Sequence, residues 1–274
     1  CLFFMIYRLL LIAGLLMQQA SAQELYVYMD PASNVPAHSL VTRFTTQFLA
    51  PTDGTGASVQ AATEMDWGVK ARWMLRWNTY WQQWGKGSLF SGSSLYSKYR
   101  FYSEDDIHQH FRLAAFGKLA GNRYNEMGEM IDLNGMHSGT ELGIIATALK
   151  GKTAVSVSTS LVSAFQPLAF QKTGNKPVAF NYSLSAGKLL LPREYSGYQQ
   201  TNLNLMLELL AQTNAGSGRT NIDWAPSIQL IFKSRYRIDF GYRFPWLNQL
   251  SRVNERSFLV RLEMVFFNVR SRLK

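Results

Sequence analysis

Residues 202–209 read Asn-Leu-Asn-Leu-Met-Leu-Glu-Leu, so that leucine takes every second position beside mostly polar neighbours. Residues 236–243 repeat this period in Tyr-Arg-Ile-Asp-Phe-Gly-Tyr-Arg, with apolar side chains at one parity and charges at the other. Successive side chains of a β-strand point to opposite faces. Each stretch therefore predicts a strand with one strongly apolar face and one face whose charges are costly to bury in a dry core.

The alternating segments are about ten to fourteen residues long, whereas strands of soluble sheets usually have about five or six residues. A tilted strand needs about ten residues to cross a bilayer, and closure into a barrel satisfies its backbone groups in lipid. We therefore predict an all-β, transmembrane, antiparallel up-and-down β-barrel of about 12 strands, or 10 or 14 if one hairpin is miscounted. A secreted β-sandwich is the alternative. The segments are 38–48, 59–69, 73–84, 89–101, 107–121, 139–150, 153–165, 177–190, 199–213, 220–232, 235–245 and 256–269.

The connections and the aromatic residues agree with a barrel. Four of the connections after even-numbered segments are short, at 70–72, 103–106, 151–152 and 233–234, while the one after the eighth segment, 192–198, is somewhat longer. Several connections after odd-numbered segments are longer, notably 122–138, 166–176 and 246–255. Outer-membrane barrels have short periplasmic turns, long external loops and aromatic girdles. Aromatic residues on the apolar faces are Trp67, Trp73, Trp77, Trp81, Tyr99, Tyr236, Tyr242 and Phe266.

Composition narrows the class further. The chain has 274 residues and a net charge of +10, yet only 17% of its residues are charged and 14% are aromatic, which excludes intrinsic disorder. The one cysteine, Cys1, excludes a disulfide framework. No apolar run of about 18 residues follows the N-terminus, so a polytopic helical membrane protein is excluded as well.

The N-terminus has the sequence pattern of an export signal. Arg8, the apolar run of residues 9–16 and Ala20-Ser21-Ala22 predict a signal peptide over residues 1–22, with a membrane anchor as the alternative. Residues 23–37 are expected on the periplasmic side, where they are able to tuck into or cap the lumen. The barrel is expected over 38–269 with a tail at 270–274, and the predicted location is the cell outer membrane.

The polar faces should line the lumen. These charges either pair into a lattice that fills a narrow barrel or line a water-filled passage and set its selectivity, with a small basic excess that favours anions. A 12-stranded barrel lies between the filled and the open sizes. The candidates are Arg43, Glu64, Asp66, Arg76, Lys98, Arg100, Arg112, Lys118, Glu141, Glu208, Asp223, Arg237, Asp239, Arg243, Arg261 and Glu263.

Two further groups of residues are candidates for metal binding or catalysis. Met127, Met130, Met136 and His137 offer thioether and imidazole ligands that suit Cu(I), although such methionines also pack on a barrel rim. A serine beside His108, His110 or His137 could serve a lipid hydrolase, but adjacent His137 and Ser138 rarely share a hydrogen bond. No G-x-S-x-G motif is present, so we expect no enzyme.

Several stretches resemble known families. Residues 24–37, 96–101, 110–117 and 200–208 resemble uncharacterised outer-membrane β-barrel proteins associated with heavy-metal efflux gene clusters. Residues 225–232, followed by Ser234-Arg235, are similar to outer-membrane barrels of the meta-cleavage pathway of phenol degradation. The resemblance implies an outer-membrane barrel with a presumed transport role and no established catalytic residues.

The predicted function is passive or facilitated passage of a small solute. A closed structural or ligand-binding barrel, with a soft metal as one candidate ligand, is the alternative, and an outer-membrane lipid hydrolase is third. Expected partners are outer-membrane lipid and lipopolysaccharide, the barrel-assembly machinery and a small-molecule solute. We expect no cofactor, and no nucleic acid because the basic charge is spread over strands and turns.

Overall fold

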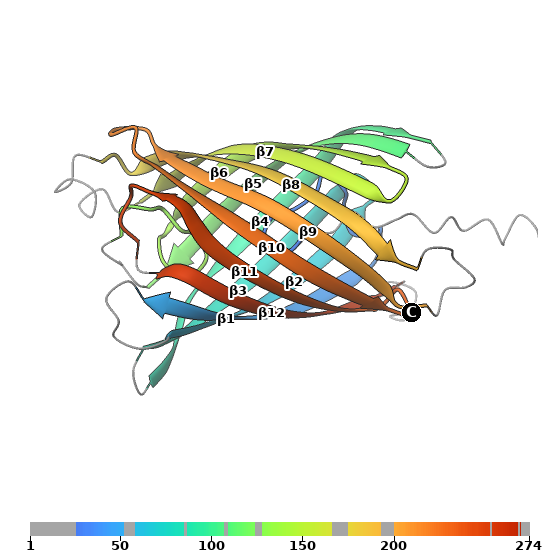
Figure 1. Cartoon of the computed structure of the whole chain (residues 1–274), viewed down its shortest axis with the longest axis horizontal. Coiled ribbons are helices and arrows are strands. Elements are labelled where there is room, and N and C mark those ends of the chain that lie inside the picture. The colour runs from blue at the N-terminus through green and yellow to red at the C-terminus, as the bar shows by residue number, and fades with distance from the viewer. Residues whose placement is uncertain are drawn as a thin grey trace, which may run out of the picture.

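Twelve antiparallel strands close into one barrel in the computed structural model, which describes residues 26–51, 58–84, 87–106, 109–123, 128–165, 175–192, 200–252, 254–267 and 269. Each strand pairs with the next along the chain and β1 pairs with β12, which leaves no sheet edge (Figure 1). The strands are β1 Leu40–Pro51, β2 Ser58–Lys70, β3 Trp73–Trp84, β4 Gly87–Asp105, β5 Gln109–Asn122, β6 Gly139–Lys150, β7 Thr153–Ala164, β8 Val178–Leu191, β9 Asn202–Asn214, β10 Thr220–Phe232, β11 Tyr236–Asn248 and β12 Asn254–Phe266.

The predicted fold class is confirmed, and the twelve predicted segments become the twelve strands with shifted ends. The turn predicted at 103–106 is wrong, because β4 continues to Asp105 and pairs there with His110 of β5. The pairing of β4 with β5 has a register shift between Arg100 and Tyr102 and continues beyond it to Asp105. The acidic residues that predicted a turn therefore belong to the strand.

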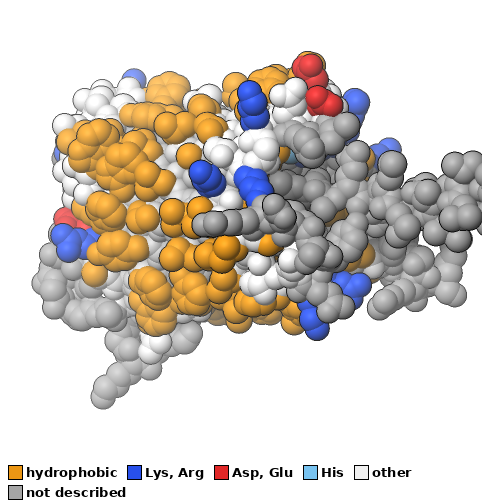
Figure 2. Space-filling model, turned by 45° about the vertical axis from the view of Figure 1, so that its right-hand side comes forward, with side chains coloured by type: hydrophobic (Ala, Val, Ile, Leu, Met, Phe, Trp, Pro, Cys, Tyr) orange, Lys and Arg blue, Asp and Glu red, His pale blue; other side chains and the backbone are white. Residues whose placement is uncertain are grey.

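Alternation along each strand separates an apolar exterior from a polar interior. On β9, Leu205 and Leu207 are 48% and 46% exposed, whereas Met206 and Glu208 between and beside them are buried. Figure 2 shows hydrophobic side chains gathered in a broad band over the outside of the barrel. Of the aromatic residues predicted on the apolar faces, all are exposed except the half-buried Trp81. No helix in the described parts of the chain is long and apolar enough to span a membrane.

The barrel has two unlike ends. We call the end with the β2–β3, β4–β5, β6–β7 and β10–β11 connections the turn end, and the opposite end the loop end. Residues 26–36, hereafter the plug, precede β1 and therefore approach from the turn end. Between the plug and β1 the chain passes beside Gly68, whose carbonyl accepts a hydrogen bond of 2.7 Å from the His38 amide.

Gly68 is required by the close approach of the plug. A Cβ at this position would lie 2.0 Å from the carbonyl oxygen of Pro36, a backbone atom with little room to move. We expect Gly68→Ala to loosen the plug at the usual overpacking cost of about 1–3 kcal/mol, and so to speed chymotrypsin cleavage near Tyr28 by roughly tenfold or more. Gly121→Ala is the control, because nothing lies within 4 Å of its added Cβ. Equal cleavage rates in both variants would contradict this prediction.

Candidate functional site in the lumen

A belt of ion pairs runs along one wall of the lumen. Arg43 of β1 lies at its centre and contacts Asp66 at 2.8 Å, Glu64 at 3.2 Å and Glu263 of β12. Arg76 of β3 extends the belt by a 2.6 Å contact with Asp66. All of these side chains are largely buried, and buried charges persist in proteins when they are paired.

The belt continues beyond β12. Arg237 of β11 contacts Glu263 at 2.9 Å and Asp239 at 3.1 Å. Gln229 of β10 donates a 3.0 Å hydrogen bond to Asp239 and accepts one of 2.8 Å from Asn204 of β9. The polar network thus crosses seven neighbouring strands, from β3 through β1 and β12 to β9, along the wall and not across the lumen.

The plug lies inside the barrel, and Glu208 is its principal anchor. The Glu208 carboxyl, fully buried on β9, accepts hydrogen bonds from the amides of Val27, Tyr28 and Met29, each of 2.9 Å. Three consecutive amides directed at one carboxyl form an anion-binding backbone concavity. Hydrogen bonds to a charged acceptor are stronger than those between neutral groups.

Further contacts hold the plug from other strands. The guanidinium of Arg76 donates two hydrogen bonds, of 2.8 and 2.9 Å, to Asp30. Lys98 of β4 donates to the carbonyls of Pro31 at 2.6 Å and Ser33 at 2.8 Å. Arg112 of β5 reaches Ser33, Thr147 of β6 accepts from Ala32, and Arg261 of β12 donates to Val27. The plug is therefore fastened to six strands around the lumen.

Asp30 is the one acidic side chain that the plug contributes to this arrangement. Burial raises the pKa of its carboxyl, but the nearby charges of Arg76 and Lys98 lower that pKa by more, so it lies below its ordinary value. Asp30 therefore stays ionised at neutral pH and retains its paired contact with Arg76.

Residues 128–138, hereafter the loop insert, fold inward from the loop end. The amide and carbonyl of Ile131 both bond to the Gln212 side chain of β9, at 2.7 and 2.8 Å. Asn134 accepts from Lys118 of β5 at 2.6 Å and, through its carbonyl, from Gln60 of β2. Ile131 is also part of a buried apolar cluster with β5, β7 and β8. The loop insert thus narrows the lumen from the side opposite the plug.

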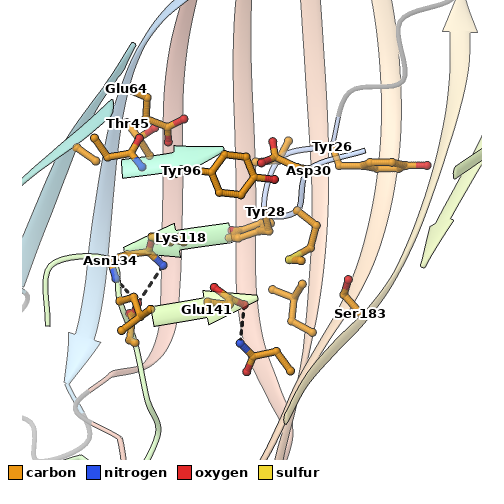
Figure 3. Close-up of a pocket in the computed structure, with 18 of the residues that line it drawn as sticks. Tyr26, Tyr28, Asp30, Thr45, Glu64, Tyr96, Lys118, Asn134, Glu141 and Ser183 are labelled. Atoms are coloured by element: carbon orange, nitrogen blue, oxygen red, sulfur yellow. Dashed lines mark hydrogen bonds between the residues drawn. The ribbon is translucent and has the colours of Figure 1, made fainter. Parts of the chain in front are cut away.

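A cavity of about 330 Å³, hereafter the chamber, lies between the plug and the loop insert. Figure 3 shows Tyr28 and Asp30 on one side of it and Lys118, Asn134 and Glu141 on the other. Ligand pockets commonly have about 300–1,000 Å³. Its charged lining residues are Asp30, Arg43, Glu64, Arg76, Lys118, Asp132, Glu141, Arg237, Arg243 and Arg261, and its aromatic ones are Tyr26, Tyr28, Tyr80, Tyr96, Phe116 and Tyr182.

The predicted lumen residues fall into four groups, and Arg100 lies apart from them. Arg43, Glu64, Arg76, Lys118, Glu141, Arg237, Arg243 and Arg261 line the chamber. The belt contains Asp66, Asp239 and Glu263. The plug is held by Lys98, Arg112 and Glu208. Near the loop end, Asp223 pairs with Arg243 at 2.6 Å and with Arg252 at 2.7 Å. Arg100 instead reaches the carbonyl of Ala71 at the turn end, so the structure does not bring it to the chamber.

The predicted Met/His ligands are only partly brought together. Met130, Met136 and His137 border a second, smaller cavity of about 70 Å³, whereas Met127 lies outside the described residues. His137 Nδ1 accepts a 3.2 Å hydrogen bond from the Asp132 amide, and Asn221 approaches the Met130 sulfur at 3.7 Å. Within the described ranges no three His, Cys, Asp or Glu side chains are grouped to hold a metal. A soft-metal role stays a prediction.

The serine and histidine pair considered for hydrolysis is not assembled at the loop insert. Ser138 Oγ donates to the Asn122 carbonyl at 3.0 Å and accepts from the Asn122 amide at 2.8 Å. It therefore holds the end of β5 to the start of β6. His108 lies outside the described residues, and His110 lies in register with Asp105 at the turn end.

Sequence reasoning missed the residues that close the chamber. Asp30, Tyr28, Asn134 and Gln212 were not among the predicted site residues. The segments that carry Asp30 and Asn134 lack strand alternation, so the sequence offered no face to assign to them. Gln212 lies on the polar face of β9, but its side chain is neutral, and the predicted lumen residues are all charged.

A closed barrel with an apolar exterior, a charged interior and short turns at one end defines the chain as an outer-membrane-type β-barrel. No family model matches the chain, and no curated protein matches it. The resemblances to heavy-metal-associated and meta-pathway barrels therefore stay predictions.

The chain is similar to solved structures. The crystal structure of the COG4313 outer membrane channel from Pseudomonas putida F1 is similar, with 11% sequence identity and a TM-score of 0.57, over 88% of this chain and 100% of that chain. The NanC porin matches at 10% identity and a TM-score of 0.48, over 83% of this chain and 98% of that one. The KdgM porin matches at 12% identity and a TM-score of 0.45, over 83% and 99%.

Proposed function

We propose that this protein is an outer-membrane channel for a small polar or charged solute, and that the chamber is a station on the path. The observation that carries the proposal is the chamber itself: charged and aromatic side chains from opposite walls surround an unfilled space at the centre of the barrel. A barrel that serves only as a structural lattice would fill this space with paired side chains.

The arrangement of charges favours a lumen that lets a solute pass over a lumen filled by paired side chains. The belt satisfies its charges along one wall, from β3 to β9, and leaves the opposite wall of β5 to β8 with sparser charge. There Glu141 accepts hydrogen bonds from Ser160 and Asn181, at 2.5 and 2.9 Å, and Lys118 donates to Asn134. Charged groups that face an aqueous path set the selectivity of a pore.

The plug closes this path toward the turn end, and the loop insert narrows it toward the loop end. Passage then requires the plug, the loop insert or both to shift. We propose in addition that residues 1–22 are a signal peptide and that the turn end, from which the plug enters, faces the periplasm. The passage of a small solute is likewise part of the proposal. Lipopolysaccharide and the barrel-assembly machinery stay predicted partners.

Reversing one chamber charge tests the channel. We expect the full mature chain in planar bilayers to carry current, and Lys118→Glu to shift its reversal potential in a KCl gradient toward cation selectivity. Lys118 borders the chamber and donates to the loop insert, so its charge acts where solute would pass. The control is Lys150→Glu, the same charge change at the exposed last residue of β6, which should shift the potential far less.

A closed ligand-binding barrel is the second candidate, favoured by the number of contacts that hold the plug and the loop insert in place. Folded protein that stays silent in the bilayer, with the plug still protected from protease, would reject the channel and support this alternative.

A further inference from the structure

A separate cavity lies on the outer surface at the turn end. It has about 670 Å³ and is lined by Lys70, Ala71, Arg72, Trp73 and Tyr99. Lys70 is the last residue of β2, and Arg72 is the second residue of the two-residue turn between β2 and β3. Trp73 and Tyr99 are cross-strand partners on β3 and β4. Two cations and two aromatic rings thus border one open hollow outside the barrel.

The two rings mark the depth of this cavity in the membrane. Trp73 and Tyr99 are 39% and 50% exposed on the apolar exterior, at the edge of the hydrophobic band. Tryptophan and tyrosine at such positions sit at the level of the lipid headgroups. A 2.9 Å hydrogen bond from Trp73 Nε1 to Ser97 fixes the orientation of the indole.

The two cations are exposed and available to a ligand. Lys70 and Arg72 are both exposed, and neither forms an ion pair with any residue that the structure describes. The turn that carries them is held in place by Arg100, whose amide donates to the Arg72 carbonyl at 2.8 Å and whose side chain donates to Ala71 at 3.2 Å. Hydrogen bonds from β4 therefore hold the turn beside the strands that carry the two rings.

We propose that this cavity binds the headgroup of an anionic phospholipid in the leaflet at the turn end. Arginine matches phosphate oxygens with two parallel donors and lysine adds a point charge, while the rings cover the glycerol and upper acyl region. Basic pockets at a membrane surface bind phospholipid headgroups in this way. The inference does not depend on conduction, because the cavity lies outside the lumen.

Native mass spectrometry of the full folded chain tests the proposal. In uncharged detergent, with equal amounts of short-chain phosphatidylglycerol and phosphatidylcholine, we expect one phosphatidylglycerol to bind preferentially. Lys70→Gln with Arg72→Gln should weaken that binding by roughly thirtyfold, as expected for two basic side chains at a membrane surface, and leave phosphatidylcholine unchanged.

The matched control removes the same charge elsewhere. Lys233→Gln with Arg235→Gln alters the exposed β10–β11 turn and should retain the phosphatidylglycerol preference. Equal loss in both double variants would mean a general charge effect and would overturn the site, as would equal binding of the two lipids by the unaltered chain. Competition by inorganic phosphate as strong as that by the lipid would assign the cavity to a soluble anion and reject the phospholipid.

Discussion

The Glu208→Ala variant is expected to raise the ratio of open to closed channels in planar bilayers by roughly 100-fold. In the parent chain, the Glu208 carboxyl accepts hydrogen bonds from three plug amides, each of 2.9 Å, which makes it the principal anchor of the plug. Hydrogen bonds to charged groups contribute about 1.5–3 kcal/mol each, and water replaces part of that once the plug moves. We therefore expect a net loss of about 2.7 kcal/mol, which corresponds to the roughly 100-fold change.

Two companion variants make this result specific. Glu208→Gln keeps one acceptor oxygen and should open the channel to an intermediate degree. Glu141→Ala also removes a lumen carboxylate, but its partners Ser160 and Asn181 belong to the wall, so the open probability should not rise. Faster proteolysis of the plug in Glu208→Ala without any increase in current would show that the plug is not the barrier.

Loss of the central guanidinium is expected to be the most destabilising single change in the lumen. In Arg43→Met, the carboxylates of Asp66, Glu64 and Glu263 each lose a buried partner. Removing one member of a buried ion pair costs about 3–5 kcal/mol, because it leaves charge uncompensated. For a chain of this size the unfolding temperature should fall on the order of 10 °C.

Heat-modifiable migration on a gel measures this change in the folded barrel. Arg43→Lys keeps the charge but not the planar fork, so its unfolding temperature should lie between those of the parent and Arg43→Met. Arg235→Met, on an exposed turn, should leave the temperature nearly unchanged. An Arg43→Met barrel as stable as the parent would contradict a structural role for the belt.

The face of the strand on which each side chain lies could be predicted from the sequence, because it depends only on the alternation of neighbouring residues. Glu208 sits between Leu207 and Leu209, and Arg43 precedes Phe44, so the period of two assigned each charge to the interior. The turn predicted at 103–106, which falls largely within β4, is the exception, and its cause can be identified. The bulge near Arg100 changes the register, and no alternation pattern shows where an extra residue will be accommodated.

Contact partners were not readable, because barrel closure and the plug's path decide them. Arg43 meets Glu263 across 220 positions of sequence, since β1 and β12 meet only when the sheet closes. Glu208 meets Val27 across 181 positions, because the chain turns back beside Gly68 into the lumen. The sequence by itself thus determined the barrel, its polarity and most of the residues facing inward. Only the tertiary structure decided which of them pair, which hold the plug and which border the chamber, because those outcomes depend on distances set by closure.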